Sequence, residues 1–426
     1  FVIGARVLFE PLLLMLLLKT VADLGIFSPN KPLNTVRKNM QAFTFSTSQC
    51  IICEMGAASR LSEICQQQGM QSVMLITDQG IKQLGLHENA LDSFNKTNIA
   101  VYVFSDVQAD PPESLILKAI ELAKAANVDA IIGFGGGSSM DVAKIVALLA
   151  HPTCKQQLAD IYGINNARGE RLPLIQVPTT AGTGSEVTQV AIVTSGETTK
   201  MGAVTPLFLP DIAVLDAELT MGLPPHVTAA TGIDAMVHAI EAYTSKVKKN
   251  PMSDLMAKES LRLMAGNIQT AVHHGSDKKA RENMLFGAML AGQAFANSPV
   301  AAVHALAYPL GGHFHIPHGL SNSLVLPHVM RFNLVNAADL YAELAAIIFP
   351  EEKFIGTTLD ISTLLIENIE KLISELGLPS RLKEMDISAD FLPTLAEDAM
   401  LQVRLLDNNP REVSYQYALA IYQAAY

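Results

Sequence analysis

The sequence predicts an N-terminal α/β domain with a parallel, Rossmann-like sheet, followed by a C-terminal domain built only of helices. Three observations lead to this prediction. Strand-like apolar runs alternate with helical patterns in the first half, strand signals nearly vanish after Pro224, and 426 residues with 49% hydrophobic content can fill two sizeable cores. We therefore expect an extension over residues 1–40, an α/β domain over 41–223 and a helical domain over 224–426.

The extension is strongly apolar but interrupted. In "VLFEPLLLMLLLKTVADLGIF", Glu10 and Lys19 bound the longest apolar run, which is shorter than the roughly 20 residues that cross a bilayer. The small-residue cleavage site that marks a signal peptide does not follow it. We expect residues 1–40 to form an extra helix, followed by a polar linker, that docks on the body of the protein, on another subunit or on a membrane surface.

Strands and helices alternate through the predicted α/β domain. The patterns are, in order, the strands "SVMLITD" and "IAVYVFSD", the helix "PPESLILKAIELAKAANV", the strand, turn and helix of "DAIIGFGGGSSMDVAKIVALLA", and the strand "LPLIQVPTT". The prolines of the first helix stand at its start, where proline is tolerated. Strands that alternate with helices typically form a parallel sheet with helices on both faces.

A glycine turn, "FGGGSSMD" at residues 134–141, joins a predicted strand to a predicted helix. Its glycines let the backbone approach a ligand closely, and Ser138 or Ser139 is placed to cap the helix. Free amides at the start of a helix attract phosphate. The turn therefore indicates a nucleotide site, and the alternative is a tight turn whose glycines serve packing alone.

A second loop, "PTTAGTGSEVT" at residues 178–188, follows another strand with hydroxyl and glycine residues. Two such loops at the carboxyl ends of strands in one parallel sheet fit a single nucleotide site, although a surface loop has the same composition. Asp78 ends an earlier strand, where its carboxylate can accept hydrogen bonds from a ribose. It would repel a 2′-phosphate and so favours NAD over NADP, unless it is an ordinary helix cap.

Helical patterns such as "GIDAMVHAIEAY" fill the predicted second domain. There, Asp234 and His238 are four residues apart and share one helix face. The segment "VHALAYPLGGHFHIPHG" contains His304 and His318, and its glycines and prolines let the second histidine fold back toward the first. One carboxylate and three imidazoles suit Fe(II), Zn or Co(II). The alternative is a helix pair and surface histidines without a metal.

Charge and cysteine content narrow the possible partners. A net charge of −11 argues against nucleic acid or an anionic membrane as the main partner, because phosphates would be repelled. Four cysteines are too few for a disulfide scaffold and favour a reducing, cytoplasmic location. Cys50 and Cys53 form a C-x-x-C motif inside a strand-like segment, and we interpret them as strand residues.

The chain resembles the iron-containing (group III) alcohol dehydrogenase family in "FGGGSSMD", "PTTAGTGSE", "GIDAMVHAIEAY" and "HALAYPLGGHFHIPHG". The resemblance runs from about Phe43 to the end and includes "NPRE". It implies a dehydroquinate synthase-like fold and an NAD-dependent oxidoreductase that transfers a hydride between NAD(H) and a small alcohol or aldehyde. In this family a metal polarises the substrate oxygen, and homodimers are usual. Fe(II) is the implied metal, with Zn possible.

The resemblance also assigns site residues. The implied metal ligands are Asp234, His238, His304 and His318. The implied nucleotide contacts are Asp78, Gly136, Gly137, Ser138, Asp141, Thr179, Thr180, Thr183, Lys200 and Leu215. The complete set of ligands is similar to that of the iron-using branch, because zinc-using glycerol dehydrogenases lack one of the histidines.

Two positions depart from the family pattern. Some members have a proton-relaying histidine four residues after the first loop ligand, where this chain has Tyr308, and the family's Asn-Pro is Asp110-Pro111 here. The second change is expected to alter nucleotide affinity. Tyr308 and His315 are the expected proton-transfer residues, with His313 as a third candidate, and all three are alternatively structural. Tyr308 would need a pKa well below its usual value of about 10.

Other functions stay open from the sequence. A hydroxyacid–oxoacid transhydrogenase uses the same scaffold with a nucleotide that it never releases, and a dehydroquinate synthase-like lyase shares the fold but suits this ligand set less. Outside enzymes, the apolar segment at residues 1–40 is compatible with a membrane-associated binding protein.

Overall fold

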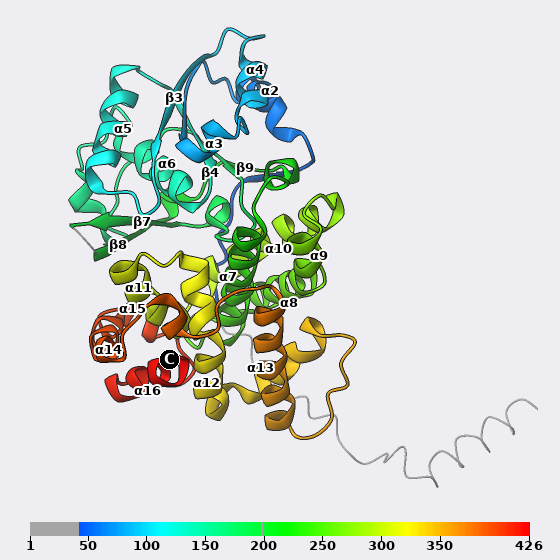
Figure 1. Cartoon of the computed structure of the whole chain (residues 1–426). Helices are drawn as coiled ribbons and strands as arrows, with labels where there is room; N and C mark the ends of the chain where they lie inside the picture. The colour runs from blue at the N-terminus through cyan, green and yellow to red at the C-terminus, as the bar shows by residue number, and fades with distance from the viewer. Residues whose placement is uncertain (1–41, 197–198) are drawn as a thin grey trace, which may run out of the picture. The chain divides into compact units, whose positions relative to one another are not determined.

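Six parallel strands form the main sheet of the computed structural model, which describes residues 42–196 and 199–426 (Figure 1). The strands are β1 (Cys50–Cys53), β2 (Ser72–Asp78), β3 (Ala100–Val107), β4 (Ala130–Gly135), β6 (Leu174–Pro178) and β9 (Ile212–Leu215). Their order across the sheet is β1-β9-β6-β4-β2-β3. Because β2, β4 and β6 are parallel neighbours, their carboxyl ends lie at the same edge of the sheet.

The middle strands of this sheet are buried on both faces. Val73 and Leu75 of β2 belong to one core, and Met74 and Ile76 of the same strand belong to another, because successive side chains of a strand point to opposite faces. Helices cover each face. They are η1 (Ala57–Arg60), α2 (Leu61–Gln67) and α4 (Glu88–Phe94) on one face, and α5 (Glu113–Ala125) and α6 (Gly137–Leu149) on the other. The predicted parallel α/β arrangement is confirmed.

A small second sheet is not predicted by the sequence patterns. In it, β5 (Gly163–Ile164) pairs in parallel with β8 (Thr199–Val204), which pairs antiparallel with β7 (Val190–Ser195). With two residues, β5 is too short to show an alternating pattern. The remaining short elements of this half are α3 (Gln79–Gln83), η2 (Leu158–Ile161), η3 (Ser185–Val187), η4 (Pro206–Phe208) and η5 (Ala217–Thr220).

The C-terminal half is helical, as predicted, and no strand follows β9 in the part of the chain that the structure describes. Its longer helices are α7 (Pro225–Thr244), α8 (Pro251–Ala265), α10 (Lys278–Asn297), α11 (Ala302–Phe314), α12 (His318–Ile348), α13 (Thr358–Glu375) and α16 (Tyr415–Ala425). Shorter ones are α9 (Ile268–His273), η6 (Leu382–Met385), η7 (Ala389–Phe391), α14 (Leu392–Met400) and α15 (Val403–Leu406). The helices share one continuous apolar core.

Residues 43–426 form one compact unit, inside which the last strand ends at Leu215 and the first helix of the helical half, α7, begins at Pro225. The predicted extension over residues 1–40 lies outside the described residues. Across residues 42–196 and 199–426, every helix is too short or too polar to cross a membrane.

Candidate active site

A cavity of about 750 Å³ is lined by both halves of the unit. The sheet half contributes the glycine turn after β4, the loop after β6, and residues of β7 and β8. The helical half contributes residues of α7, α10, α11, α12 and α15. The turn, the loop and the histidines that the sequence singles out therefore face the same space.

The N-terminus of α6 opens on this cavity. The helix begins at Gly137, with Gly136 as its N-cap and no side-chain cap, so the expected serine cap is wrong. Its first amide groups are consequently not occupied by a capping side chain. A Cβ at Gly137 would lie 3.0 Å from the Thr183 side chain, so the turn packs tightly against the loop after β6. An uncapped helix start beside hydroxyl groups is suited to binding phosphate.

The structure divides the expected nucleotide contacts into two groups. Those that line the cavity are Gly137, Ser138, Asp141, Thr183 and Lys200. Those that do not are Asp78, Gly136, Thr179, Thr180 and Leu215. Asp78 accepts a 2.9 Å hydrogen bond from the amide of Ile81 and so caps α3, which was the alternative interpretation of this residue.

Lys200 is paired across the cavity wall. It forms an ion pair with Asp110 and donates a 3.1 Å hydrogen bond to the hydroxyl of Thr194. Asp110 has a φ of 54°, an uncommon conformation for a residue other than glycine. Asp110, which stands where the family has asparagine, therefore neutralises Lys200, one of the expected nucleotide contacts.

A fully buried lysine ties the glycine-turn helix to the loop after β6. The ammonium of Lys144 on α6 donates hydrogen bonds to the hydroxyls of Ser185 (2.7 Å) and Thr188 (3.0 Å) and to the carbonyl of Val190 (2.7 Å). Asp141 accepts a 2.7 Å hydrogen bond from Ser185. Burial lowers the pKa of Lys144 and raises that of Asp141. This network holds the loop in one position against α6.

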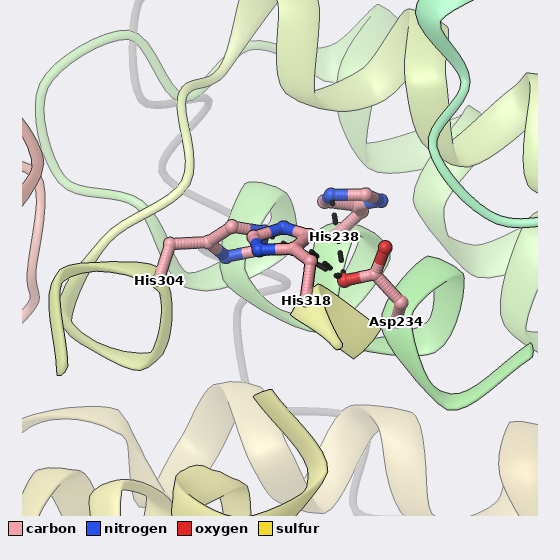
Figure 2. Close-up of side chains that lie close together, drawn as sticks. All are labelled: Asp234, His238, His304 and His318. Carbon is pink, nitrogen blue, oxygen red and sulfur yellow. Dashed lines mark ion pairs between the residues drawn. The ribbon is translucent and has the colours of Figure 1, made fainter. Parts of the chain in front are cut away.

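Four side chains from three helices converge on one side of the cavity (Figure 2). Asp234 and His238 stand on α7, His304 on α11, and His318 at the first position of α12. One ligand atom from each residue lies within 4.8 Å of all the others. The Nε2 atoms of His318, His238 and His304 lie 3.7, 3.9 and 4.0 Å from Oδ1 of Asp234.

Two further polar residues orient this cluster. Glu241 accepts a 2.6 Å hydrogen bond from Nδ1 of His304 and a 2.7 Å hydrogen bond from the amide of Val303. The Nε2 atom of His304 is therefore left with its lone pair directed at the cluster. The amide of Asn322 donates to Asp234 at 2.6 Å and lies 3.3 Å from Nε2 of both His304 and His318.

The protonation states of the cluster favour a cation. Burial lowers the pKa of His238 to about 3, so its ring is neutral at pH 7. Burial acts to raise the pKa of Asp234, but the neighbouring histidines and the hydrogen bond from Asn322 together outweigh it and leave the pKa below its usual value. The carboxylate of Asp234 and the imidazole nitrogens that face it are acceptors, and three of the four residues are almost fully buried. A cation between them would relieve their mutual repulsion. This set of donors fits a divalent metal.

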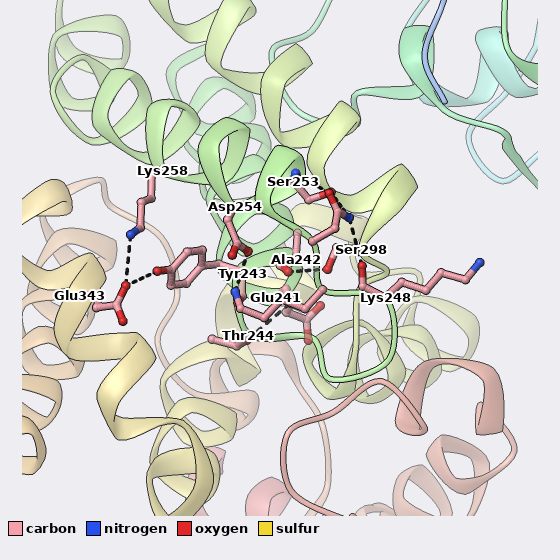
Figure 3. A network of polar contacts seen from close by, with 12 residues as sticks. Glu241, Ala242, Tyr243, Thr244, Lys248, Ser253, Asp254, Lys258, Ser298 and Glu343 are labelled. Carbon is pink, nitrogen blue, oxygen red and sulfur yellow. Dashed lines mark hydrogen bonds and ion pairs between the residues drawn. The ribbon is translucent and has the colours of Figure 1, made fainter. Parts of the chain in front are cut away.

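The far end of α7 is anchored away from the cluster (Figure 3). Tyr243 donates a hydrogen bond to Glu343 of α12, which also accepts one from Lys258 of α8 at 3.1 Å. Ser298 donates a 2.7 Å hydrogen bond to the carbonyl of Ala242. The helix that carries two of the four clustered residues is thus fixed to its neighbours.

The expected proton-transfer residues are placed differently from one another. Tyr308 lines the cavity, with its ring 6.0 Å from that of His318, but burial raises its pKa, the opposite of what a proton acceptor at neutral pH needs. His315 is exposed and ends α11, and it does not line the cavity. His313 also lies outside the cavity lining and bonds Asp398 at 2.5 Å. The structure therefore brings only Tyr308 to the site.

Several residues of the site are missed by reasoning from the sequence. Glu241 follows His238 by three residues and Asn322 follows His318 by four, so helical spacing alone could have suggested both. Lys144 and Arg404 carry no such signal. The first becomes part of the site only through burial, and the second only because α15 lies against the cavity.

Comparison with known protein families gives two matches that together cover most of the chain. Residues 48–217 match the family model described as iron-containing alcohol dehydrogenase. Residues 228–426 match the model described as the Fe-containing alcohol dehydrogenase family, C-terminal. The gap between the two matches contains the start of α7.

Individual proteins are similar over nearly their whole length. Long-chain-alcohol dehydrogenase 1 of Geobacillus thermodenitrificans is 38% identical over 372 residues, which cover 87% of this chain and 93% of that protein. The crystal structure of a 1,3-propanediol oxidoreductase aligns with a TM-score of 0.87 and 34% identity over 91% of this chain and 100% of the other. Sulfoacetaldehyde reductase from Bifidobacterium kashiwanohense, solved in complex with NAD+, aligns with a TM-score of 0.80 and 28% identity over 90% and 99% of the two chains.

Proposed function

Because the chain belongs to the iron-containing alcohol dehydrogenase family, we propose that Asp234, His238, His304 and His318 hold its catalytic metal. The protein is a metal-dependent alcohol dehydrogenase that transfers a hydride between NAD(H) and an alcohol or aldehyde. The observation that carries the proposal is the position of the four donors. They converge within 4.8 Å on the wall of the cavity that the glycine turn also lines.

The donor set suits Fe(II), and Zn is the second candidate. A divalent metal bound there would supply the positive charge that stabilises an alkoxide or polarises a carbonyl. The side chains set where that charge lies. Asp234 and His238 are fixed on one helix face, Glu241 fixes the ring of His304, and His318 lines the cavity at the beginning of α12.

The nucleotide is proposed to bind with its phosphates at the start of α6. Gly137, Ser138 and Thr183 line the cavity there, and the NAD+ complex of the sulfoacetaldehyde reductase supports the choice of NAD. Asp141, Lys200 and the five expected contacts outside the cavity lining, Asp78, Gly136, Thr179, Thr180 and Leu215, are proposed to position the turn, the loop and the ribose.

The substrate oxygen is proposed to bind beside His318, and the nicotinamide is proposed to face the carbon that bears this oxygen. The names of the relatives support an alcohol or aldehyde substrate, a long-chain alcohol in one case and 1,3-propanediol in others. His315 is exposed and lies outside the cavity lining, so we propose no role for it in proton transfer. Tyr308 is positioned to donate a hydrogen bond, and its raised pKa keeps it protonated.

We also propose an assembly and a cellular location for the protein. A homodimer is the expected assembly, and size-exclusion chromatography with light scattering would measure it. The four cysteines are all free, which supports a reducing compartment such as the cytoplasm. Contact of residues 1–40 with a membrane surface stays a proposal, which cell fractionation of chains with and without that segment would test.

A single assay tests the function. Anaerobically purified, Fe(II)-loaded protein is mixed with NAD+ and 1-butanol, and NADH is followed by its absorbance. The proposal predicts many turnovers per chain, and their loss when a chelator removes the metal. A transhydrogenase would instead reduce only its own bound nucleotide and would need an acceptor substrate to turn over. The complete absence of NADH under these conditions would contradict the assignment.

A further inference from the structure

Three cationic side chains line the cavity, and only one of them has an acidic partner. Lys200 pairs with Asp110. Arg404 and Lys248 make no side-chain hydrogen bond or ion pair within residues 42–196 and 199–426. Figure 3 shows the Lys248 side chain extending away from the polar network at the end of α7. Both cations are therefore available to a ligand.

The acidic side chains of the cavity do not balance these two cations. Asp141 accepts hydrogen bonds from Ser185 and from the amide of Ile192, and Asp234 belongs to the metal cluster. The remaining carboxylate, Asp407, follows Arg404 by three residues but forms no ion pair with it. In the described chain, two unpaired cations thus face the cavity against one unpaired carboxylate, an arrangement that attracts an anion.

Arg404 belongs to a helix that packs against α11, which carries His304 and Tyr308. It stands on α15, with one guanidinium nitrogen 3.8 Å from the point where a Cβ on Gly202 of β8 would lie. Its charge acts against the burial that raises the pKa of Tyr308, whose ring is 6.0 Å from that of His318. The guanidinium is therefore on the cavity wall beside β8, and its helix packs against the helix that carries Tyr308.

The rest of this wall is largely apolar. Phe295 and Val300 line the cavity in the helical half. Three more aliphatic residues line it although more than half of each side chain is exposed, namely Ile164 (58%), Val247 (56%) and Val403 (58%). Exposed aliphatic side chains on a cavity wall favour an apolar ligand segment that covers them. The cavity thus combines an oxygen-binding end, an aliphatic wall and unpaired cations.

We propose that the substrate is an aliphatic alcohol, or its aldehyde, that carries a carboxylate or a similar anionic group, and that Arg404 binds this group. A planar guanidinium matches a carboxylate with two parallel hydrogen bonds, which the ammonium of Lys248 cannot do.

In the oxidation, the carbinol C–H bond breaks and its electron pair goes with hydrogen to NAD+, giving NADH. The hydroxyl proton goes to solvent, and the anionic group is unchanged. This inference rests on the proposed function.

Two other ligands compete for Arg404. The diphosphate of the nucleotide offers the same kind of anion, but its proposed site is the start of α6, whereas the guanidinium of Arg404 lies beside Gly202 of β8. An unsubstituted alkanol would use the aliphatic wall and leave both cations without a partner. The test below separates these ligands from an anionic substrate.

The experiment compares matched aldehydes with the metal-loaded enzyme and NADH. 6-Oxohexanoate, its methyl ester and hexanal have similar aliphatic segments and differ in charge. The variants are Arg404→Leu, Arg404→Lys and Lys248→Met, and the control is Arg381→Leu, which changes the net charge equally at an exposed position outside the cavity lining. Circular dichroism checks that each variant is folded.

We expect the wild type to prefer the carboxylate over both neutral aldehydes in kcat/KM. Arg404→Leu should reduce this preference by about 10- to 100-fold, the usual effect of losing a charge-assisted hydrogen bond. Arg404→Lys should retain part of the preference, Lys248→Met should reduce it less, and Arg381→Leu should not change it.

Three results would overturn the inference. One is a wild-type enzyme that prefers hexanal. Another is a carboxylate preference that survives Arg404→Leu. The third is a rise in the KM for NADH in Arg404→Leu without any change in aldehyde preference, which would assign Arg404 to the nucleotide. Should no aldehyde be turned over, the proposed function fails by itself. Calorimetric binding of 6-hydroxyhexanoate against 1-hexanol to wild type and Arg404→Leu then still tests the anion site.

Discussion

Glu241 controls the metal cluster without being one of its four members. It accepts the Nδ1 proton of His304 at 2.6 Å and also holds the amide of Val303, where α11 begins. A carboxylate in this position fixes the ring orientation of a histidine ligand and raises its basicity. The affinity of the proposed site for metal is therefore expected to depend on Glu241, which is not one of the proposed ligands.

Replacement of Glu241 by glutamine should lower metal affinity by about 10- to 100-fold, because a neutral amide stabilises the imidazole less well. Activity should be low in limiting Fe(II) and largely restored in excess Fe(II). Competition with a chromophoric chelator measures the affinity. The matched control is Glu397→Gln at an exposed position of α14, and equal affinities of the two variants would contradict the role of Glu241.

At the level of residues, sequence reasoning predicts the cluster better than its surroundings. The four expected ligands converge because Asp234 and His238 are one helical turn apart, and the loop between α11 and α12 is short enough to bring His318 back to His304. His315 lies in the same histidine-rich segment, yet it is exposed at the end of α11. Residue type and spacing do not reveal on which side of a turn a side chain emerges.

At the level of elements, two glycines allow the loop after β6 to touch α10. A Cβ at Gly184 would lie 2.5 Å from the Cα of Gly292, and a Cβ at Gly292 would lie 2.8 Å from the Cα of Gly184. Gly184 also has a φ of +60°. The contact joins the sheet half to the helical half beside the cavity, so neither position tolerates a side chain without a shift of the backbone.

Alanine at Gly184 should reduce the free energy of unfolding by about 1–3 kcal/mol through the clash and by about 1 kcal/mol more through the left-handed backbone. Alanine at Gly292 should reduce the free energy of unfolding only by the part that is due to the clash. Gly377→Ala is the control for backbone strain, because Gly377 has a φ of +74° and nothing within 4 Å of the added Cβ. Urea denaturation measures all three, and a Gly184→Ala effect no larger than that of Gly377→Ala would contradict the close contact.

The buried network behind the glycine turn should make stability depend on pH. Burial raises the pKa of Glu186 to about 7, and the nearby ammonium of Lys144 offsets only part of this effect. In the unfolded chain this carboxyl ionises near its ordinary value of about 4.5. The unfolded state therefore releases the proton first, and stability is lost as the pH rises from about 4.5 through 7.

Glutamine at position 186 should remove this loss. The stability of Glu186→Gln relative to wild type should increase between pH 5 and pH 8, whereas Glu397→Gln should show no such trend. Thermal unfolding at several pH values measures the difference. A Glu186→Gln variant that becomes less stable than wild type as the pH rises would show that the buried carboxylate is charged and stabilising.

The elements themselves were predictable to different extents. The long apolar runs of β2, β4 and β6 and the helical spacing of α5, α6 and α7 show in the sequence, because burial on both faces or on one stripe imposes a period on the residues. The two-residue β5 and its pairing with β8 depend on contacts between distant segments. No local pattern encodes such contacts.

For the whole molecule, the metal should act as a link between three helices. Its proposed ligands stand on α7, α11 and α12, so binding to the folded state stabilises all three together. Fe(II) or Zn at 100 times its dissociation constant should stabilise the protein by about 2.7 kcal/mol. Calorimetry with and without metal tests this prediction, and no change in the melting temperature on metal removal would argue against a site that spans these helices.

The two halves of the molecule were distinguishable in the sequence, but the cavity that they line was not. The change from strand patterns to helical patterns near residue 223 agrees with the interval between β9 and α7. Which residues of α10 and α15 line the cavity depends on how the helices pack. That is why Phe295 and Arg404 enter the account only with the structure.

The most direct test of the central claim is the metal content of two histidine variants after anaerobic purification and loading with Fe(II). His318→Ala removes a proposed ligand, and His315→Asn changes an exposed neighbour whose left-handed conformation asparagine tolerates. The account predicts about one metal ion per chain in wild type and in His315→Asn, and little metal and no turnover in a folded His318→Ala. Full metal content and activity in His318→Ala would contradict it.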